Sequence, residues 1–464
     1  MQRDHRLSVE DTFERALGEI RTRVSVSSPA IAVAYSGGLD SAALLHLAHR
    51  YAQQQGTHLV AFHVHHGISA NADHWLAHCR DQCAVLGVPF DFRQVDMTGS
   101  GKSGVEEAAR LRRYAALGDL CRAHDVSLLL TAHHLDDQAE TVLLQLLRGS
   151  GVAGLSGMDQ ANHAPDLLGD ARLMMGRPLL QVARVELESF VGQHAIAFVE
   201  DESNLDPRYA RNALRHHVMP VLQQYFPGFQ ERFARTAQHT QAAQRILIDL
   251  AAHDLAACVD GDALDVEKVG KLNNDRIDNL LRYWFGSRHI RMPSTAWLAE
   301  LRKQLFEAKY DAQLCVTHAD CHIRRHRHRV FITPKRAPDC LAVEAHTFVW
   351  QGETALRSPQ FGGTLFFERG ENGFDPEWLR VQPLTLRLRG GGERLKLAQN
   401  RPTRTLKHHY QARDVPAWER ERLPLLFAGN QLLFAAGIGM DCHCADKSTE
   451  RIALRWEFDA ADAG

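Results

Sequence analysis

The sequence has 464 residues, which is too long for one ordinary hydrophobic core and predicts several domains. Its 45% apolar and 24% charged residues exclude a disordered chain, and no apolar run is long enough to span a bilayer. Nine scattered cysteines favour reduced thiols, and the first residues carry no apolar signal core, so we expect a cytoplasmic protein without a membrane segment. With a net charge of −2, any nucleic acid must be held by local basic patches.

Short apolar runs alternate with helical patterns in the first part of the chain. Strands are predicted at 30–35, 58–64, 89–95 and 126–132, and helices at 8–24, 39–51, 71–86, 104–124 and 182–195. This alternation predicts an α/β fold with a parallel sheet and crossover helices on its faces. Such sheets bind their ligands where the strands end.

The character of the chain then changes twice. A helical pattern runs from about 228 to 310, short strands are expected over 312–333, and Thr, Val and Gly become more frequent after 340. We therefore predict three domains: an N-terminal parallel-sheet domain, a mainly helical middle domain and a small mixed α/β C-terminal domain (1–222, 223–340 and 341–464).

A glycine-containing loop follows the first strand directly. In Ser36-Gly-Gly-Leu-Asp-Ser41 the glycines allow a close backbone approach, and the N–H groups of the next helix face outward, where they attract phosphate. Asp40 could hold a magnesium ion against those phosphates. The pattern matches the pyrophosphate-binding loop (PP-loop) of ATP-pyrophosphatases; an ordinary helix-capping turn is the alternative. We expect ATP to contact Ser36, Gly37, Gly38, Leu39, Asp40 and Ser41.

An acidic motif, His133-His-Leu-Asp-Asp-Gln-Ala-Glu-Thr141, follows the strand that ends at Ala132. If a helix starts at Asp136, helical spacing places Asp137, Glu140 and Thr141 on one face. Carboxylates there could bind magnesium, orient an amine and accept its proton, although Asp at a helix N-terminus also stabilises the helix without any catalytic role.

Histidines at strand ends leave a second interpretation open. A metal hydrolase could bind zinc or a dinuclear centre through His63, His65, His66, His133 and His134. Such an enzyme would not need the glycine loop. Thr98-Gly-Ser-Gly-Lys-Ser103 is not a Walker A loop, because Asp96 stands where the first glycine is needed.

Basic residues on three segments are candidates for contacts with phosphate. Glu106, Arg110 and Arg113 share a helix face that could reach a triphosphate or simply be solvated. A second group consists of Arg208, Arg211 and Arg215. Their spacing suits contact with phosphate and equally suits salt bridges on a surface helix, so it does not decide between the two. Between Leu384 and Arg422, ten Lys or Arg against four acids leave six excess positive charges, with Tyr410 and Trp418 as stacking surfaces; this predicts an RNA contact that includes Arg394, Arg404 and Lys407.

Together these motifs resemble the bacterial tRNA(Ile)-lysidine synthase family, a branch of the PP-loop ATP-pyrophosphatases. The resemblance covers nearly the whole chain and rests on 36–41, 65–67, 109–114, 133–141, 147–155, 177–180, 201–212, 389–394, 404–407, 416–418 and 422–426. It implies that ATP adenylates the C2 oxygen of the wobble cytidine in the CAU anticodon of an isoleucine tRNA. The ε-amine of L-lysine then displaces AMP, and the tRNA reads AUA instead of AUG.

The resemblance also implies roles for particular residues. Asp40 would bind Mg²⁺, with Asp137 as a second candidate ligand, and Arg113 would contact the phosphates. Lysine would be held by His134, Asp137 and Glu140. Arg211 would contact the tRNA, and the C-terminal domain would grip the acceptor end, although His408-His-Tyr410 departs from the more apolar segment expected there.

Two other functions remain open at this stage. A related PP-loop enzyme that thiolates tRNA bases with an iron–sulfur cluster would need paired cysteines such as Cys-x-x-Cys, and the sequence has none. A non-catalytic RNA-binding protein with a dead nucleotide fold would function without Asp40.

Overall fold

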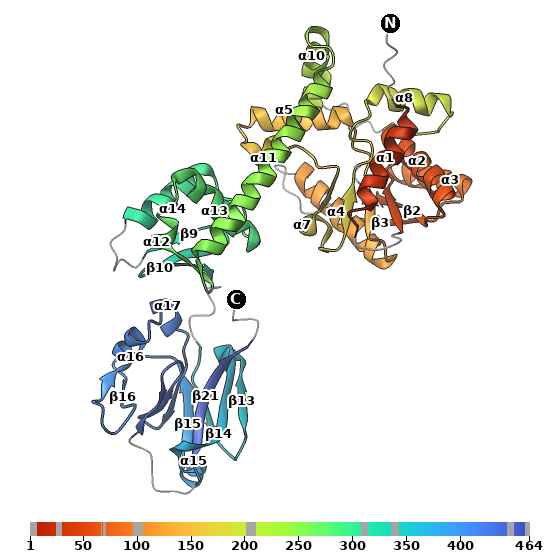
Figure 1. Cartoon of the computed structure of the whole chain (residues 1–464). Helices are drawn as coiled ribbons and strands as arrows, with labels where there is room; N and C mark the ends of the chain where they lie inside the picture. Colours follow the sequence, from red (N-terminus) through yellow and green to blue (C-terminus); the bar gives the residue numbers. More distant parts are fainter. Residues whose placement is uncertain are drawn as a thin grey trace. The chain divides into compact units, whose positions relative to one another are not determined.

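The computed structural model describes residues 7–24, 30–65, 67, 71–95, 105–200, 210–307, 314–335, 343–442 and 450–459, without the side chains of 105–107. The chain forms two compact units, 1–250 and 251–464 (Figure 1). None of the helices in the described ranges combines the length and apolar character that a bilayer crossing requires.

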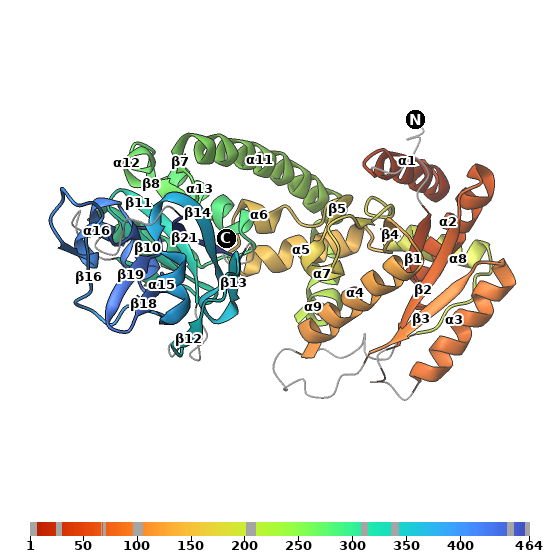
Figure 2. The same ribbon diagram turned by 90° about the horizontal axis from the view of Figure 1, so that it is seen from below.

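The first unit is built on a six-stranded sheet of order β3-β2-β1-β4-β6-β5 (Figure 2). Its strands are β1 (Ile31–Ala34), β2 (Leu59–His65), β3 (Phe90–Gln94), β4 (Leu128–Leu130), β5 (Ala161–His163) and β6 (Met174–Gly176). All neighbours pair parallel except β5, which runs antiparallel to β6. The predicted α/β fold and its four parallel strands are confirmed. The short β5 and β6 fall in the stretch 149–178, for which no strand was predicted.

Helices cover both faces of this sheet because the side chains of its central strands β1 and β4 are apolar on both faces. Ile31 and Val33 of β1 belong to one core, with residues of α1 (Val9–Arg21), α2 (Leu39–Gln55), α3 (Ala72–Leu86) and α8 (Arg184–Gln193). Ala32 belongs to the other core, with α4 (Val105–Ala123) and α7 (Pro165–Leu168). The unit is completed by α5 (Leu135–Leu147), α6 (Val152–Leu155), α9 (Ala210–Ala213), the π-helical η2 (Leu214–Val218), α10 (Met219–Tyr225) and the first part of α11 (Phe229–Cys258).

The second unit begins with an antiparallel sheet of order β7-β8-β11-β10-β9 and three helices. Its elements are β7 (Val259–Asp260), β8 (Ala263–Asp265), α12 (Val266–Val269), α13 (Asn274–Ser287), α14 (Thr295–Glu307), β9 (Cys315–Thr317), β10 (Cys321–His326) and β11 (Arg329–Pro334). Trp284 and Phe285 of α13 are fully buried in its core.

The remaining residues of the second unit form sheets of order β12-β15-β18-β19-β20, β13-β14-β21 and β16-β17. The strands are β12 (His346–Val349), β13 (Ala355–Ser358), β14 (Gly363–Phe374), β15 (Pro383–Arg387), β16 (Arg394–Leu395), β17 (Arg404–Thr405), β18 (Leu425–Ala428), β19 (Gln431–Ala435), β20 (Gly439–Met440) and β21 (Ile452–Phe458). The helices are η4 (Pro359–Phe361), α15 (Pro376–Val381), α16 (Leu406–Ala412) and α17 (Ala417–Arg420).

Candidate active site

The glycine loop connects β1 to α2 and is open on its outer side. Ser36 is exposed, whereas Gly37 is buried at φ +87°, a backbone conformation that favours glycine. The Ser41 hydroxyl accepts the Ser36 N–H at 3.2 Å and donates to the Gly38 carbonyl at 2.9 Å, which closes the loop. Gly38 is the N-cap residue of α2 and makes no side-chain hydrogen bond to the helix. The first N–H groups of α2 therefore have no side-chain cap from Gly38 and can face a phosphate.

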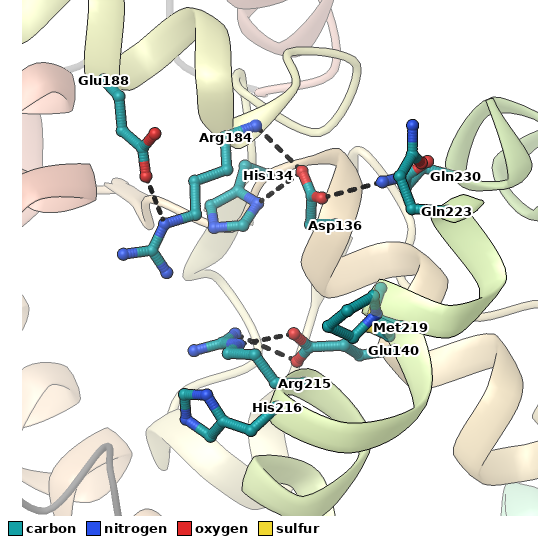
Figure 3. A pocket seen from close by; sticks show the side chains of 11 residues that line it. His134, Asp136, Glu140, Arg184, Glu188, Arg215, His216, Met219, Gln223 and Gln230 are labelled. Carbon is teal, nitrogen blue, oxygen red and sulfur yellow. Dashed lines mark hydrogen bonds and ion pairs between the residues drawn. The ribbon is translucent and has the colours of Figure 1, made fainter. Parts of the chain in front are cut away.

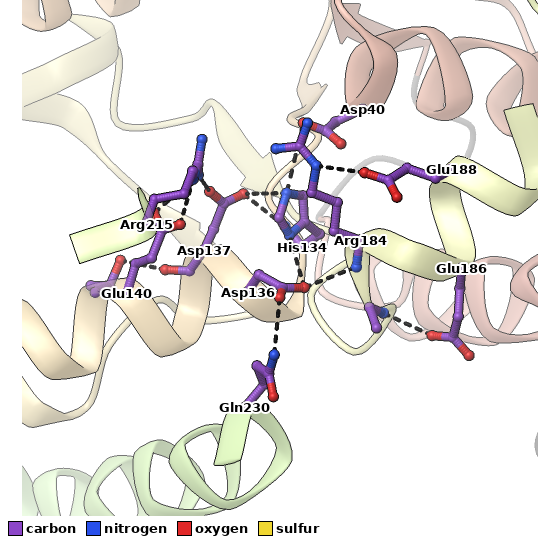
Figure 4. A network of polar contacts seen from close by, with 12 residues as sticks. Asp40, His134, Asp136, Asp137, Glu140, Arg184, Glu186, Glu188, Arg215 and Gln230 are labelled. Atoms are coloured by element: carbon purple, nitrogen blue, oxygen red, sulfur yellow. Dashed lines mark hydrogen bonds and ion pairs between the residues drawn. The ribbon is translucent and has the colours of Figure 1, made fainter. Parts of the chain in front are cut away.

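The acidic motif begins α5 at the end of the neighbouring strand β4. Because β1 and β4 pair in parallel, their ends lie at the same edge of the sheet. The His134 Nε2 atom lies 3.7 Å from the Asp40 carboxylate and 3.4 Å from that of Asp137, and Nδ1 lies 3.7 Å from Asp136 (Figure 4). The structure therefore brings the glycine loop and the acidic motif together at one imidazole.

The two histidines of this motif have opposite protonation preferences. Burial lowers the pKa of His134, but three carboxylates outweigh it and raise the pKa above its usual value: Asp40, Asp137 and Asp136. Burial also lowers the pKa of His133 to about 3, and Asp137 does not compensate because Arg177 and Arg211 act in the opposite direction. Burial would raise the pKa of Asp137, but its neighbours lower it to about 2: His134, Arg211, His133 and Arg215. The site thus favours a cationic His134 beside ionised carboxylates and a neutral His133.

Two arginines from the following helical segment contact the same carboxylates. Arg211 donates to Glu140 at 2.8 Å and to Asp137 at 3.1 Å. Arg215 donates to Glu140 at 2.6 and 3.0 Å and to Asp137 at 3.1 Å (Figure 3 shows the pair with Glu140). The Glu140 side chain is 1% exposed, so this is a nearly buried ion-pair network. The spacing of Arg211 and Arg215 suited either phosphate contact or salt bridges, and the described contacts are salt bridges.

A cavity of about 390 Å³ lies beside this network. Asp136 is fixed at its wall by the Arg184 backbone N–H at 2.9 Å and by the Gln230 amide at 3.3 Å. Sequence reasoning missed several lining residues, which come from α8, α10 and α11 and carry no motif: Arg184, Glu188, Met219, Pro220, Gln223 and Gln230. Its size suits a small substrate, and its wall offers both carboxylates and guanidinium groups.

The residues fit a divalent cation at Asp40 better than at Asp137. The Oδ1 atom of Asp40 is buried and has no hydrogen-bond partner. Both oxygens of Asp137 are already used: Oδ1 accepts from Arg211 and Arg215, and Oδ2 accepts the His134 N–H at 3.1 Å. Mg²⁺ prefers a few carboxylates plus substrate phosphates, which Asp40 at the glycine loop could provide together with ATP.

The strand-end histidines are each held by a separate partner. His63 contacts the Tyr35 carbonyl at 2.9 Å, His65 contacts Asp73 at 3.0 Å, and His133 contacts the Thr131 hydroxyl at 2.9 Å. Within the described ranges, no three His, Cys, Asp or Glu residues form a group suited to a metal. His66 lies outside the described residues.

Arg113 on α4 is exposed. The pKa of His63 is lowered mainly by burial, and the charge of Arg113 lowers it further. Arg110 lies over the Tyr114 ring, 5.7 Å from its centroid. Outside the described residues lie Arg208, the segment 98–103 and the side chain of Glu106. The phosphate contacts of these residues stay predictions.

Two thiols lie behind the glycine loop. Cys79 and Cys83 are both fully buried, and burial raises the pKa of both, in Cys83 to about 12. They are neutral thiols rather than reactive thiolates, which does not favour a thiolation chemistry that would use them.

Comparison with known proteins places the chain in a family. The PP-loop domain model matches residues 9–222, the TilS substrate binding domain model matches 264–331, and the TilS substrate C-terminal domain model matches 384–456. The chain is 42% identical to the tRNA(Ile)-lysidine synthase of Burkholderia pseudomallei and 40% identical to that of Ralstonia nicotianae, with 94% of each chain covered in both cases. It is 34% identical to that of Coxiella burnetii, covering 97% of this chain and 96% of the relative.

The chain belongs to the tRNA(Ile)-lysidine synthase family. The resemblance seen in the sequence is thereby confirmed, and the PP-loop domain implies that the chain uses ATP.

The basic segment of this family member is partly exposed and partly buried. Arg394 and Arg404 lie on the exposed β16–β17 hairpin, and Lys407 is exposed at the start of α16. One prediction for this segment is wrong. Tyr410 is fully buried, with its hydroxyl donating to the Ala436 carbonyl at 3.1 Å, and cannot offer a stacking surface. Arg420, one of the ten basic residues counted in this segment, is also buried and donates to the Val415 carbonyl at 2.7 Å.

Trp418 also has structural partners. Its half-buried ring packs against Phe331 at 5.6 Å and His326 at 6.1 Å between centroids, with the Arg324 guanidinium 5.4 Å away. Trp418 therefore packs against β10 and β11, and its predicted role as a stacking surface for RNA stays a prediction. The glycine-rich turn before β16 binds a carboxylate of the same segment. The backbone N–H groups of Gly390 and Gly391 donate to the Glu393 carboxylate at 2.6 and 3.1 Å.

Proposed function

We propose that this tRNA(Ile)-lysidine synthase family member carries out ATP-dependent formation of lysidine at the wobble cytidine of an isoleucine tRNA with a CAU anticodon. The observation that carries this function is the 3.7 Å contact between Asp40 and His134. It joins the loop suited to the phosphates of ATP with the carboxylates suited to an amine. An adenylating ligase needs those two groups at one place.

In the first step, the C2 oxygen of the cytidine attacks the α-phosphorus of ATP and pyrophosphate leaves. The N–H groups at the start of α2, with Ser36 and Ser41, hold the pyrophosphate end. Asp40 would hold Mg²⁺, which would neutralise charge on the phosphates. Arg113 contacts the phosphates, and cationic His134 faces the charge that develops beside Asp40.

In the second step, the ε-ammonium group of L-lysine is oriented by Asp137 and Glu140 and first gives up one proton to become an amine. The amine attacks C2 of the activated base, AMP leaves with the former C2 oxygen, and the new C–N bond is completed when the nitrogen releases a second proton to solvent. Both carboxylates are paired with Arg211 and Arg215 in the described structure, so lysine must share or displace a guanidinium. This arrangement is compatible with tight specificity for an amine. A substrate with a neutral side chain would displace a guanidinium without replacing its charge, and the carboxylates would be left unpaired.

The tRNA is bound by basic residues of two segments. The anticodon side of the tRNA is contacted by Arg208, Arg211 and Arg215, and other parts of its phosphate backbone are contacted by Arg394, Arg404 and Lys407. We keep the division into a catalytic domain (1–222), a middle tRNA-binding domain (223–340) and a C-terminal domain for the acceptor stem (341–464). The reaction takes place in the cytoplasm, which agrees with the free thiols of the described cysteines.

The decisive experiment combines the chain with ATP, Mg²⁺, L-lysine and a tRNA(Ile) transcript bearing CAU, followed by digestion and mass spectrometry of the nucleosides. We expect lysidine with the wild-type chain. Asp40→Ala should abolish lysidine while the tRNA still binds, and Asp119→Ala, which alters a surface pair with Arg122, should act like the wild type. An Asp40→Ala chain with full activity would favour a non-catalytic nucleotide fold, and a thiolated base would favour the related tRNA thiolases.

A further inference from the structure

Helix α10 has one packed face and one exposed apolar face. Met219 is buried in a small core with Ala139 and Phe229, and Leu222 packs against that core. On the other side Val221 and Tyr225 are four residues apart, which puts them on one face of the helix, and Val218 lies directly before it at the end of η2. Val218, Val221 and Tyr225 are 37%, 51% and 69% exposed, and Phe226, directly after the helix, is 57% exposed.

This exposure is unusual for aromatic rings in this chain. Within the described ranges, Tyr225 and Phe226 are the only aromatic side chains that are more than half exposed. In Figure 1 α10 projects from the edge of the first unit, beyond α5. A pair of neighbouring exposed rings on a helix with a separate buried face indicates a surface that a ligand covers.

The exposed rings lie at the end of a helix whose other residues line the candidate active site. Met219, Pro220 and Gln223 of α10 line the cavity that also includes His134 and Glu140. The six steps from Met219 to Tyr225 correspond to about 9 Å along a helix. Stacked bases are about 3.4 Å apart, so the rings lie within a few nucleotides of a base that enters the cavity.

The segment carries no negative charge that would repel a nucleic acid. Between Ala210 and Gln230 the chain contains no Asp or Glu, and its two arginines, Arg211 and Arg215, are paired with Asp137 and Glu140. Exposed aromatic rings are typical of surfaces that bind unpaired bases by stacking. The seven residues of α10 are too few to form the roughly 800 Å² per partner of an ordinary protein interface.

We propose that Tyr225 and Phe226 form a stacking platform for unpaired bases of the anticodon loop next to the wobble cytidine. The inference rests on the proposed function, because it places the target base in the neighbouring cavity. The rings bind the tRNA and take no part in the chemistry at C2. Their role is to hold the loop in the position from which one base enters the cavity.

The test uses the full chain and a tRNA(Ile) transcript with 2-aminopurine in place of the adenine next to the wobble cytidine. Stacking on a ring should quench the fluorescence of the probe when the wild-type chain binds. Tyr225→Leu with Phe226→Leu keeps much of the apolar area but removes both rings. We expect this double variant to lose the quenching and to bind the unmodified tRNA about 5- to 100-fold more weakly, with the KM values for ATP and lysine unchanged.

Two controls separate stacking from simple apolar contact. Tyr225→Phe keeps the ring and should retain the quenching, and Val85→Ala removes an 80% exposed apolar side chain on α3 and should change nothing. An unchanged tRNA affinity in the double leucine variant, with lysidine still formed by the wild type, would overturn this inference alone. Absence of lysidine with the wild type would instead reject the proposed function. A wild-type dimer that dissociates in the double variant on sedimentation would show that a second copy of the chain covers the rings, which also overturns the inference.

Discussion

His134 has an exceptional position, because it is the one imidazole that contacts both predicted motifs in the described structure. Its raised pKa follows from the carboxylates of Asp40, Asp137 and Asp136, which outweigh burial. A raised pKa means that these ion pairs stabilise the fold fully below the unfolded value of about 6.5. That contribution is lost as the pH rises through the higher folded-state value.

We therefore predict a divergent titration of the two neighbouring histidines in the chain without ATP. His134 should titrate above about 6.5, whereas His133 should stay neutral down to a pKa of about 3. NMR of histidine-labelled protein would measure both, with His133→Gln and His134→Gln to assign the signals. Titration of His134 below the ordinary value would contradict the ion pairs described for the site.

Glu140 is the most deeply buried acid of the network, and its charge is balanced only by the two arginines. Glu140→Gln should lower the free energy of unfolding by about 2 kcal/mol, less than for a fully buried pair because the arginines are partly exposed. Glu188→Gln is the matched control, since its pair with Arg184 is exposed on both sides and should cost less than about 0.5 kcal/mol. Urea denaturation measures both; equal losses would show that the buried network adds no stability.

The sequence predicted this network only in part. Helical spacing correctly grouped Asp137 with Glu140, and Arg211 with Arg215, because residues three or four apart share a face. Spacing within one helix cannot show that two helices about 70 residues apart in the chain pack together. The same limit explains Tyr410, whose hydroxyl donates to the Ala436 carbonyl 26 residues further along the chain and whose burial the charge of its own segment does not indicate.

At the level of elements, β1, the glycine loop and α2 were predictable because a doubly buried strand is a continuous apolar run. The antiparallel β5 and the short β6 were not, since three residues are too few to show a periodicity. The sequence predicted that Gly37 allows a close approach of the backbone, but it could not show which residues lie close to it. A Cβ atom there would lie 2.9 Å from the Cys79 sulfur and 3.1 Å from a Val199 methyl group, at a positive φ.

The two loop glycines should therefore respond differently to substitution. Gly37→Ala should cost about 2 kcal/mol of stability, from the left-handed backbone and the contacts of the added methyl group, and raise the KM for ATP at least tenfold. Gly38 has a negative φ and no atom closer than 3.7 Å to an added Cβ, so Gly38→Ala should change the stability by less than about 0.5 kcal/mol. Thermal melts and ATP kinetics of the two variants would measure the difference. Equal melting temperatures would show that the loop conformation does not require glycine at position 37.

At the scale of the whole molecule, a net charge of −2 is compatible with RNA binding only if positive charge is concentrated locally. The exposed Arg394, Arg404 and Lys407 provide such a concentration on β16, β17 and α16. Many other arginines are neutralised by acids, as Arg455 is by Glu368 and Glu457. Counting charges along the sequence could not separate these two classes.

This separation can be tested through the salt dependence of tRNA binding. Each phosphate contact contributes about 0.7 to 0.9 to the slope of log K against log salt concentration. Arg404→Gln combined with Lys407→Gln should therefore weaken binding and reduce the magnitude of that slope by about 1.4 to 1.8, because two contacts with the backbone are removed. Arg455→Gln, which removes a cation that is also exposed but is paired with Glu368 and Glu457, should leave the slope as it is. If the slope stays the same in the double variant, the positive charge on the β16–β17 hairpin and α16 does not contact the tRNA backbone, and the basic surface must be sought elsewhere in the chain.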